Sequence, residues 1–305
     1  MSQSWKRFIG MGIESTWATP VVPTVWLRFV GDDSLTMTAN IIELDGTEEA
    51  RSKLAYADGD WTCEGDISDI EILPGLCRTL FKLAMGTETG SGPYVFTLID
   101  DIMPSCTIEL QRGNTQAYQY RGMKVNTMSI SAAARETLKC NISMVGQREV
   151  ELGSAEARTY LDETPFVFWQ GIFKYKVDGG TLDEYYVQEF SLDLNNNLRH
   201  PFMVSGQRYS REQTEGVRDV TGSFKTLFDA QAKALYDDAL TFAEGEMDFT
   251  FTHADGAILK FEFPRVMLES PDFDRGDQDY DTTFNFRCFK TGSDKEFKVT
   301  YTEAP

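Results

Sequence analysis

Histidines and clustered acidic residues are the side chains in this sequence that could support catalysis or bind a metal. The chain has two histidines, His200 and His253, and neither has a nucleophile or metal ligand at the spacing of a known motif. The densest acidic run covers residues 272–281, but Thr283 stands where an EF-hand loop needs its bidentate glutamate. We therefore expect no catalytic, cofactor-binding or metal site. Calcium binding by the acidic run is the alternative to a solvated loop.

The cysteines also indicate structure rather than chemistry. They are odd in number, widely spaced and mostly set in apolar runs, and none forms a CxxC pair; they are Cys63, Cys77, Cys106, Cys140 and Cys288. This pattern is typical of reduced core cysteines in a protein made in the cytoplasm. The first eight residues lack the apolar segment of a signal peptide, and no apolar run is long enough to cross a bilayer. We expect a soluble protein without a membrane partner.

Composition indicates a folded and strongly acidic protein. Of the 305 residues, 41% are hydrophobic and 25% are charged, and the formal net charge is -19. Such a composition is typical of a globular chain with room for two domains. A surface this acidic repels nucleic-acid phosphates, which argues against a protein that grips DNA but not against one that lets DNA slide past.

A strand followed by a helix occurs twice in the sequence. Residues 220–224 are β-rich and lead into residues 226–240, where Phe228, Ala232, Leu235 and Ala239 have the spacing of one helix face. Residues 61–67 likewise precede residues 73–84, where Leu73, Leu76, Leu80 and Ala84 form the apolar stripe. The repeated unit predicts two similar halves.

The segments before each unit also match. Residues 35–39, in an expected strand at 35–44, and residues 190–194 alternate between apolar and polar positions, as half-buried strands do. Each is followed by a long polar excursion, at residues 45–60 and 196–218, and polar stretches of this length in a compact domain are usually functional or disordered. The order strand, excursion, strand, helix and further strands indicates an internal duplication.

The many remaining strands define the fold class. Residues 137–145 alternate strictly, which indicates an antiparallel sheet with one solvated face. We predict a predominantly β, α+β fold with two tandem β-sandwich or barrel domains, each with a flanking α-helix.

The domain boundaries follow from composition. Residues 1–24 read as an extended N-terminal arm outside the core, because they are rich in Gly, Thr and Pro. The first domain is expected over residues 25–148 and the second over residues 165–305. Between them, residues 149–164 are acidic and form the expected linker.

Several segments together resemble the tail tube (major tail) proteins of long, non-contractile-tailed bacteriophages. Besides the Glu64-Gly65 strand before the leucine-rich helix, these are residues 12–23 (GIESTWATPVVP), 123–131 (MKVNTMSIS), 190–198 (FSLDLNNNL) and 221–224 (TGSF). None is a catalytic signature, but in this order they cover nearly the whole chain.

The resemblance implies a structural virion protein and no enzyme. Proteins of this family form rings whose sheets join into a continuous inner barrel, and the rings stack into the tube through which the genome is ejected. Such rings usually present six domains, so a chain with two domains implies a homotrimer with pseudo-sixfold symmetry, with a homohexamer as the alternative. The implied partners are further copies, the tape measure, tail terminator and distal tail proteins, and double-stranded DNA transiently in the lumen. The implied location is the virion tail, after synthesis in the host cytoplasm.

Two hypotheses connect these residues to assembly. The acidic excess is partly concentrated on the lumen, where it repels DNA. The polar excursions reach neighbouring domains or the next ring, and their opposite charges set the register. The residues concerned are Asp45, Glu48, Glu49 and Arg51 in the first excursion and Arg199, Arg208 and Arg211 in the second. Simple solvated loops are the alternative.

Other functions compatible with the sequence are a baseplate hub or another tail component, and a carbohydrate-binding β-sandwich. In the last case Trp61 and Trp169 would line a sugar site, although packing in a core or an interface is the more common role of such residues.

Overall fold

The structure is a computed structural model that describes residues 7–28, 31–44, 55–113, 116–177, 180–275, 280–292 and 295–305. In the first half the elements are β1 (Phe8–Ile13), β2 (Val25–Trp26), β3 (Thr36–Leu44), β4 (Ala55–Glu71), the 3-10 turn η1 (Pro74–Leu76), α1 (Cys77–Met85), β5 (Gly86–Thr89), β6 (Tyr94–Leu98), β7 (Cys106–Arg112), β8 (Gln116–Ala133), β9 (Lys139–Gly146) and β10 (Arg148–Leu152). In the second they are the 3-10 turn η2 (Phe168–Gln170), β11 (Gly171–Val177), β12 (Asp183–Tyr185), β13 (Glu189–Asn195), β14 (Asp219–Leu227), α2 (Ala230–Thr241), β15 (Glu244–Thr252), β16 (Ile258–Leu268), β17 (Asp272–Arg275), β18 (Tyr280–Cys288) and β19 (Lys298–Thr302). The chain is therefore predominantly β, as predicted, and all strand pairs are antiparallel.

The same pairing scheme occurs in both halves. In the first, β1 pairs with β2 and β7, β7 with β8, β8 with β9 and β10, β9 with β4, and β4 with β3. In the second, β11 pairs with β12 and β15, β15 with β16, β16 with β18 and β19, β18 with β14, and β14 with β13. Strand for strand, the two lists correspond.

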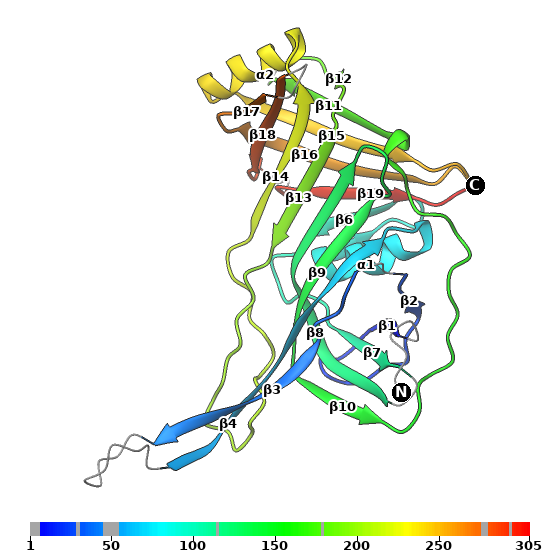
Figure 1. Ribbon diagram of the computed structural model, residues 1–305, viewed down its shortest axis with the longest axis vertical. Coiled ribbons are helices and arrows are strands. Elements are labelled where there is room, and N and C mark those ends of the chain that lie inside the picture. Colours follow the sequence, from blue (N-terminus) through cyan, green and yellow to red (C-terminus); the bar gives the residue numbers. More distant parts are fainter. Residues whose placement is uncertain are drawn as a thin grey trace.

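Strand β8 joins the halves into one sheet (Figure 1). Its N-terminal part pairs with β7 and β10, and its C-terminal part pairs with β9 on one side and β13 on the other. In the β8–β13 pair, Ile130 faces Leu192. The result is a continuous antiparallel sheet with the order β3, β4, β9, β8, β13, β14, β18, followed by β17.

The alternation of side chains along these strands explains why the sheet has one dry face. Ile130, Leu192, Phe224 and Phe284 lie at successive strands and are almost fully buried. Burying such side chains contributes roughly 1.5–3 kcal/mol each relative to exposure. A shift of one residue in register would place them in solvent, so the hydrophobic pattern fixes the pairing.

Both predicted helices are present. The first opens with Pro74 in η1 and ends at Gly86, whose φ of 93° lies in the left-handed region that favours glycine. The second begins at the N-cap Asp229, whose carboxylate accepts a hydrogen bond from the amide of Ala232 at 2.9 Å. The predicted apolar faces are buried at Leu73, Leu76, Leu80 and Ala84 in the first unit and at Ala232, Leu235 and Ala239 in the second. Phe228, predicted on the second face, lies before the helix and is 42% exposed, so that part of the prediction is wrong.

Helix α1 lies between the halves. The Phe81 ring packs against Phe96 of β6 and, in an edge-to-face contact with a centroid distance of 5.8 Å, against Phe261 of β16. Strand β6 also pairs with β19, where Phe96 faces Val299. The β5–β6 hairpin follows α1, whereas β15 follows α2 almost directly, so the β6–β19 pairing is particular to the first half.

The N-terminal segment was expected outside the core, and this expectation is wrong for residues 8–13. Strand β1 lies between β2 and β7, and Ile9 and Met11 are buried. A side chain at Gly10 would collide with the Trp26 ring, because a Cβ there would lie 2.6 Å from it. Glycine here serves close packing of a strand, not a flexible lead-in.

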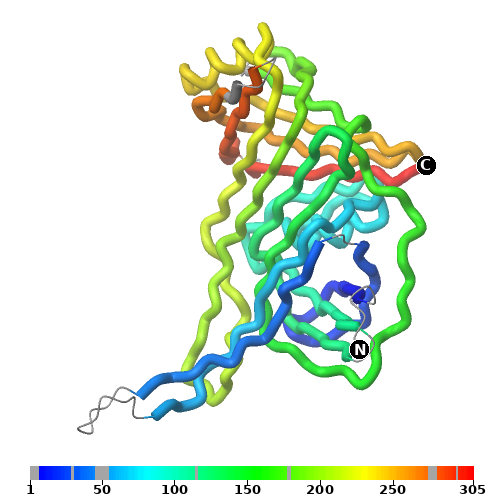
Figure 2. Tube along the Cα trace, viewed as in Figure 1, coloured from blue at the N-terminus to red at the C-terminus, as the bar shows by residue number. Residues whose placement is uncertain are grey.

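The expected linker is attached to the first half. Residues 148–152 form β10, and the irregular chain that follows runs along one side of the molecule to η2 (Figure 2). Arg28 donates hydrogen bonds to the carbonyl oxygens of Leu161 and Glu163. The Glu163 carboxylate in turn accepts a 2.7 Å hydrogen bond from the amide of Gly75.

Candidate functional site

The polar face of the continuous sheet is an unusual surface of small side chains. One row across five strands consists of Asn141, Ser129, Asp193, Thr221 and Arg287, each facing the next. A neighbouring row consists of Lys139, Ser131, Ser191, Ser223 and Asn285. Hydroxyl and amide groups therefore extend from the first half across the β8–β13 junction into the second half.

Charges on this face are mainly negative. The acidic side chains on its described strands include Glu64, Asp66, Glu71, Glu189, Asp193, Asp219, Asp272 and Asp281, and the basic ones include Lys139, Lys225 and Arg287. Lys225 lies 3.0 Å from Asp281, which neutralises part of one edge. The face as a whole repels phosphate and offers few cations to hold it.

The β3–β4 hairpin extends from the sheet at the end of the molecule opposite α2 (Figure 1). The segment between β13 and β14, residues 196–218, lies beside the hairpin's base. The amide of Trp61 donates to the carbonyl oxygen of Arg208 at 2.9 Å, and the Arg208 guanidinium donates to the carbonyl oxygen of Gly59 at 2.7 Å. That guanidinium also lies 4.4 Å from the centroid of the Trp61 ring.

Neither histidine belongs to a catalytic arrangement within the described residues. His200 Nε2 lies 3.7 Å from a carboxylate oxygen of Glu64, and burial lowers the pKa of His200 while this carboxylate opposes the shift. His253 lies between Asp255, 2.7 Å from Nδ1, and the Thr164 hydroxyl, 3.0 Å from Nε2. The His200 contact joins a loop to β4, and the His253 contacts lie within the β15–β16 turn and the segment before η2.

The cysteines are buried and unreactive. All five are free thiols, and burial raises the pKa of Cys63 to about 12. A thiol with such a pKa holds almost no nucleophilic thiolate at neutral pH. In the part of the chain that the structure describes, no group of three or more His, Cys, Asp or Glu side chains could hold a metal.

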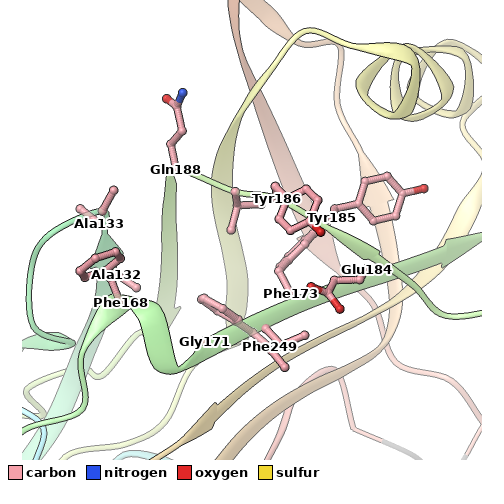
Figure 3. A pocket seen from close by; sticks show the side chains of 13 residues that line it. Ala132, Ala133, Phe168, Gly171, Phe173, Glu184, Tyr185, Tyr186, Gln188 and Phe249 are labelled. Carbon is pink, nitrogen blue, oxygen red and sulfur yellow. The ribbon is translucent and has the colours of Figure 1, made fainter.

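A sugar site built from the two tryptophans is not formed. Trp61 packs against Tyr209, with a ring-centroid distance of 4.9 Å, whereas Trp169 lies in η2 and is 68% exposed. Near η2, a hollow of about 180 Å³ is lined by Phe168, Phe173, Tyr185 and Tyr186, with Glu184 at its side (Figure 3). It is smaller than the roughly 300–1,000 Å³ typical of small-molecule sites.

A comparison with protein families decides which class of protein this is. The model of a family described as phage tail tube protein matches residues 4–288. The chain belongs to this family. Among curated proteins, no significant match was found.

A tail tube protein is a structural component of the virion and assembles with itself into a tube. The large polar sheet face and the projecting hairpin are therefore interpreted as surfaces of an assembly. Among the helices that the structure describes, none is sufficiently long and apolar to cross a membrane.

Of the described residues predicted to act in assembly, Arg208 is the one whose side chain joins the two excursions. Besides Gly59, its guanidinium contacts the Asp58 carboxylate at 3.4 Å. Arg199 and Arg211 are held by backbone bonds within residues 196–218, to Thr214 and Pro201 respectively. Asp45, Glu48, Glu49 and Arg51 lie outside the described residues. One pair of opposite charges from the two excursions, Arg208 and Asp58, thus lies within a single chain of this tail tube protein.

Lys124 is a structural anchor that sequence reasoning missed. Its side chain is fully buried, and its ammonium lies 3.0 Å from both Glu212 and Glu215 and donates to the carbonyl oxygen of Gln213 at 3.2 Å. Glu215 also accepts a 2.9 Å hydrogen bond from the amide of Met103. A lysine in an alternating strand usually points to solvent, so the one available signal was the Glu-x-x-Glu spacing in the segment that covers it.

Both ends of residues 196–218 are also fixed. Buried Asn196 donates through its amide to the carbonyl oxygens of Ala84 and Val125. At the other end, Asp100 accepts hydrogen bonds from Lys295 and Arg218, which lower the pKa of its carboxyl group. The second excursion is therefore tied to β8, to α1 and to the loop after β6.

Proposed function

We propose that this tail tube protein forms rings of three copies with pseudo-sixfold symmetry, and that these rings stack into the tube. The observation that carries the proposal is the repeated pairing scheme together with the β8–β13 junction. Each chain already contains two copies of one sheet unit joined edge to edge. Three chains would supply the six units of a ring, and a ring of six chains is the alternative.

The polar face of the continuous sheet lines the channel in this proposal. Its rows of serine, threonine, asparagine and acidic residues offer hydrogen bonds to water and repel the phosphates of double-stranded DNA. The net charge of -19 is consistent with a surface that DNA must pass without sticking.

Residues 25–148 and 165–305 form the two tube domains in this proposal, with residues 149–164 as the linker. Because β1 pairs with β7, we assign residues 8–24 to the first domain as well. The β3–β4 hairpin and residues 196–218 reach the next ring. The tape measure, tail terminator and distal tail proteins are the further partners, and the chain is made in the host cytoplasm before assembly into the virion.

Electron microscopy of the purified protein over a concentration series, combined with mass measurement per ring, tests the proposal. We expect tubes or stacked rings of uniform bore, with the mass of three chains in each ring. Six chains per ring would overturn the trimer. The protein could instead stay a monodisperse monomer at every concentration, even when a tail tip is added as initiator. That result would overturn the proposal that this chain forms rings and tubes with itself.

A further inference from the structure

Among the described residues, the continuous sheet ends at two edge strands, β3 and β17, that each pair on one side only: β3 pairs with β4, and β17 pairs with β18. Such edges present rows of unpaired amide and carbonyl groups, which are templates for pairing with another chain. The internal repeat allows the partner of each edge to be identified residue by residue.

In the first half, the reference position is Gly65 of β4, which faces Met144 of β9. Three residues before Met144 lies Asn141, which faces Ser129 of β8 on its other side. The path from Gly65 to Ser129 therefore crosses to Met144 of β9, goes back three residues to Asn141 and crosses to β8.

In the second half, Gly222 of β14 takes the place of that glycine and faces Phe286 of β18. Three residues before Phe286 lies Thr283, which faces Asp272 of β17. Asp272 therefore occupies in the second half the position that Ser129 occupies in the first, and β17 corresponds to the C-terminal part of β8.

The other edge has a counterpart too. Thr36 of β3 faces Glu64, the residue immediately before the first-half glycine. Asp193 of β13 faces Thr221, the residue immediately before the second-half glycine. Thr36 of β3 therefore corresponds to Asp193 of β13.

Within the chain, the counterparts of these edge residues are already paired. Asp193 faces Ser129, and the Ser129 hydroxyl donates a hydrogen bond to the Asp193 carboxylate. We infer that β17 of one copy pairs antiparallel with β3 of a second copy, with Asp272 facing Thr36. In the inferred pair the hydroxyl belongs to Thr36 of β3 and the carboxylate to Asp272 of β17. In the β8–β13 pair the hydroxyl is on β8 and the carboxylate on β13, so the two groups have changed places and the same kind of hydrogen bond can form.

Apolar side chains beside this pair support the same partner. Ile130 and Leu192 face each other in the junction within the chain, and both are buried. Their counterparts are Phe273 and Leu35, and Phe273 is 51% exposed although it packs edge-to-face against Phe228. Pairing with a second copy would remove this aromatic ring from water.

Exposed apolar side chains continue from this edge onto the adjoining elements. They are Leu227, Phe228, Leu240, Phe242 and Tyr280, at the end of β14, around α2 and at the start of β18. The corresponding helix in the first half, α1, is covered by the second half through Phe81 and Phe261. By the same repeat, we expect the first half of the next copy to pack over α2.

This contact is head-to-tail, because it joins different strands of the two copies. Such interfaces generate rings when the rotation closes, and closure leaves no sheet edge exposed. The inference rests on the proposed ring and adds to it the strands, the register and the residues that face each other.

Cysteine cross-linking tests the register. In the double variant Thr36→Cys/Asp272→Cys, assembled protein should form disulfides between copies, which a non-reducing gel shows as two-chain and three-chain species. The native cysteines are buried, so they contribute little background. Mixing the single variants Thr36→Cys and Asp272→Cys should give two-chain species and nothing larger.

The junction within the chain supplies a matched control. Ser129→Cys/Asp193→Cys occupies the corresponding positions and should lose its two added free thiols on oxidation while still running as a single chain on the non-reducing gel. If this control cross-links and the protein forms uniform tubes, but the Thr36→Cys/Asp272→Cys variant does not cross-link, the inferred pairing is wrong while the proposed function stands. Failure of the unmodified protein to form rings or tubes would instead overturn the proposed function and, with it, this inference.

Discussion

At the scale of single residues, the buried Lys124 ammonium is the group on which residues 196–218 most depend. It lies fully buried between two glutamates that are themselves 24% and 37% exposed. Glu215 links it further to the amide of Met103. The Lys124 ammonium holds residues 196–218 against β8, because separating them would leave a buried positive charge without its carboxylates, which costs free energy.

We expect Lys124→Met to lower the free energy of unfolding by roughly 2–3 kcal/mol, below the ~3–5 for a fully buried pair because water can reach the two freed carboxylates. Urea denaturation measures this change. Trypsin should also cleave after Arg199, Arg208 and Arg211 faster than in the unmodified protein, since the segment loses its anchor. Lys139→Met removes the exposed pair with Glu136 and should cost less than about 1 kcal/mol. Equal effects of both variants would contradict the role assigned to Lys124.

At the scale of elements, both helices and most strands could be predicted from the sequence because their apolar periods are regular. The sequence pattern alone predicts two strands, at residues 117–120 and 125–132, where the structure has the single strand β8. The gap between them contains Gly122, whose φ is 66°, and the pairing of β8 with β7 shifts between Tyr120 and Met123, so the alternation that sequence reasoning relies on is interrupted there. Strand β1 was missed because its glycines resemble a loop.

The candidate surfaces were less predictable than the elements. Alternation along residues 190–194 indicates a polar face, but which strands share that face depends on pairings between segments far apart in the sequence. Strands β10 and β17 were missed because their acidic residues suggested a linker and a solvated loop. The burial of Lys124 depends on a segment about ninety residues later in the chain, which no local pattern encodes.

Replacing a phenylalanine near α1 and replacing one near α2 should change the stability of the isolated chain by very different amounts. Phe81→Ala should lower the stability of the isolated chain by about 3–5 kcal/mol, because Phe81 is fully buried between the halves. Phe242→Asn should change that stability by less than about 0.5 kcal/mol, because Phe242 is 71% exposed and asparagine tolerates its φ of 53°. Thermal unfolding of the monomer gives both values.

Phe242→Asn should weaken assembly although it barely changes the stability of the isolated chain. The inferred contact covers the surroundings of α2, so this variant should need a higher protein concentration to form tubes than the unmodified protein does. Light scattering over a concentration series measures that threshold. An unchanged threshold would mean that the exposed ring of Phe242 faces solvent in the tube.

At the scale of the whole molecule, the distribution of charge determines how the assembled tube treats DNA. The proposed lumen face carries Asp66 and Glu189, which are exposed and directly precede buried residues of β4 and β13. Their carboxylates repel phosphates along the path of the genome. Replacing these acids with lysines converts repulsion into attraction while the sheet itself is retained.

We expect tubes of the Asp66→Lys/Glu189→Lys variant to bind double-stranded DNA in co-sedimentation, whereas tubes of the unmodified protein do not. Because the attraction releases counterions from DNA, the bound fraction should fall steeply as salt rises from about 50 to 200 mM. In phage particles the same variant should slow genome ejection. Asp183→Lys/Glu184→Lys makes an equal change of charge on β12, which lies outside the continuous sheet, and should leave DNA inside the tube unaffected. If this control slowed ejection as much as the lumen variant, total charge rather than the lumen face would govern passage.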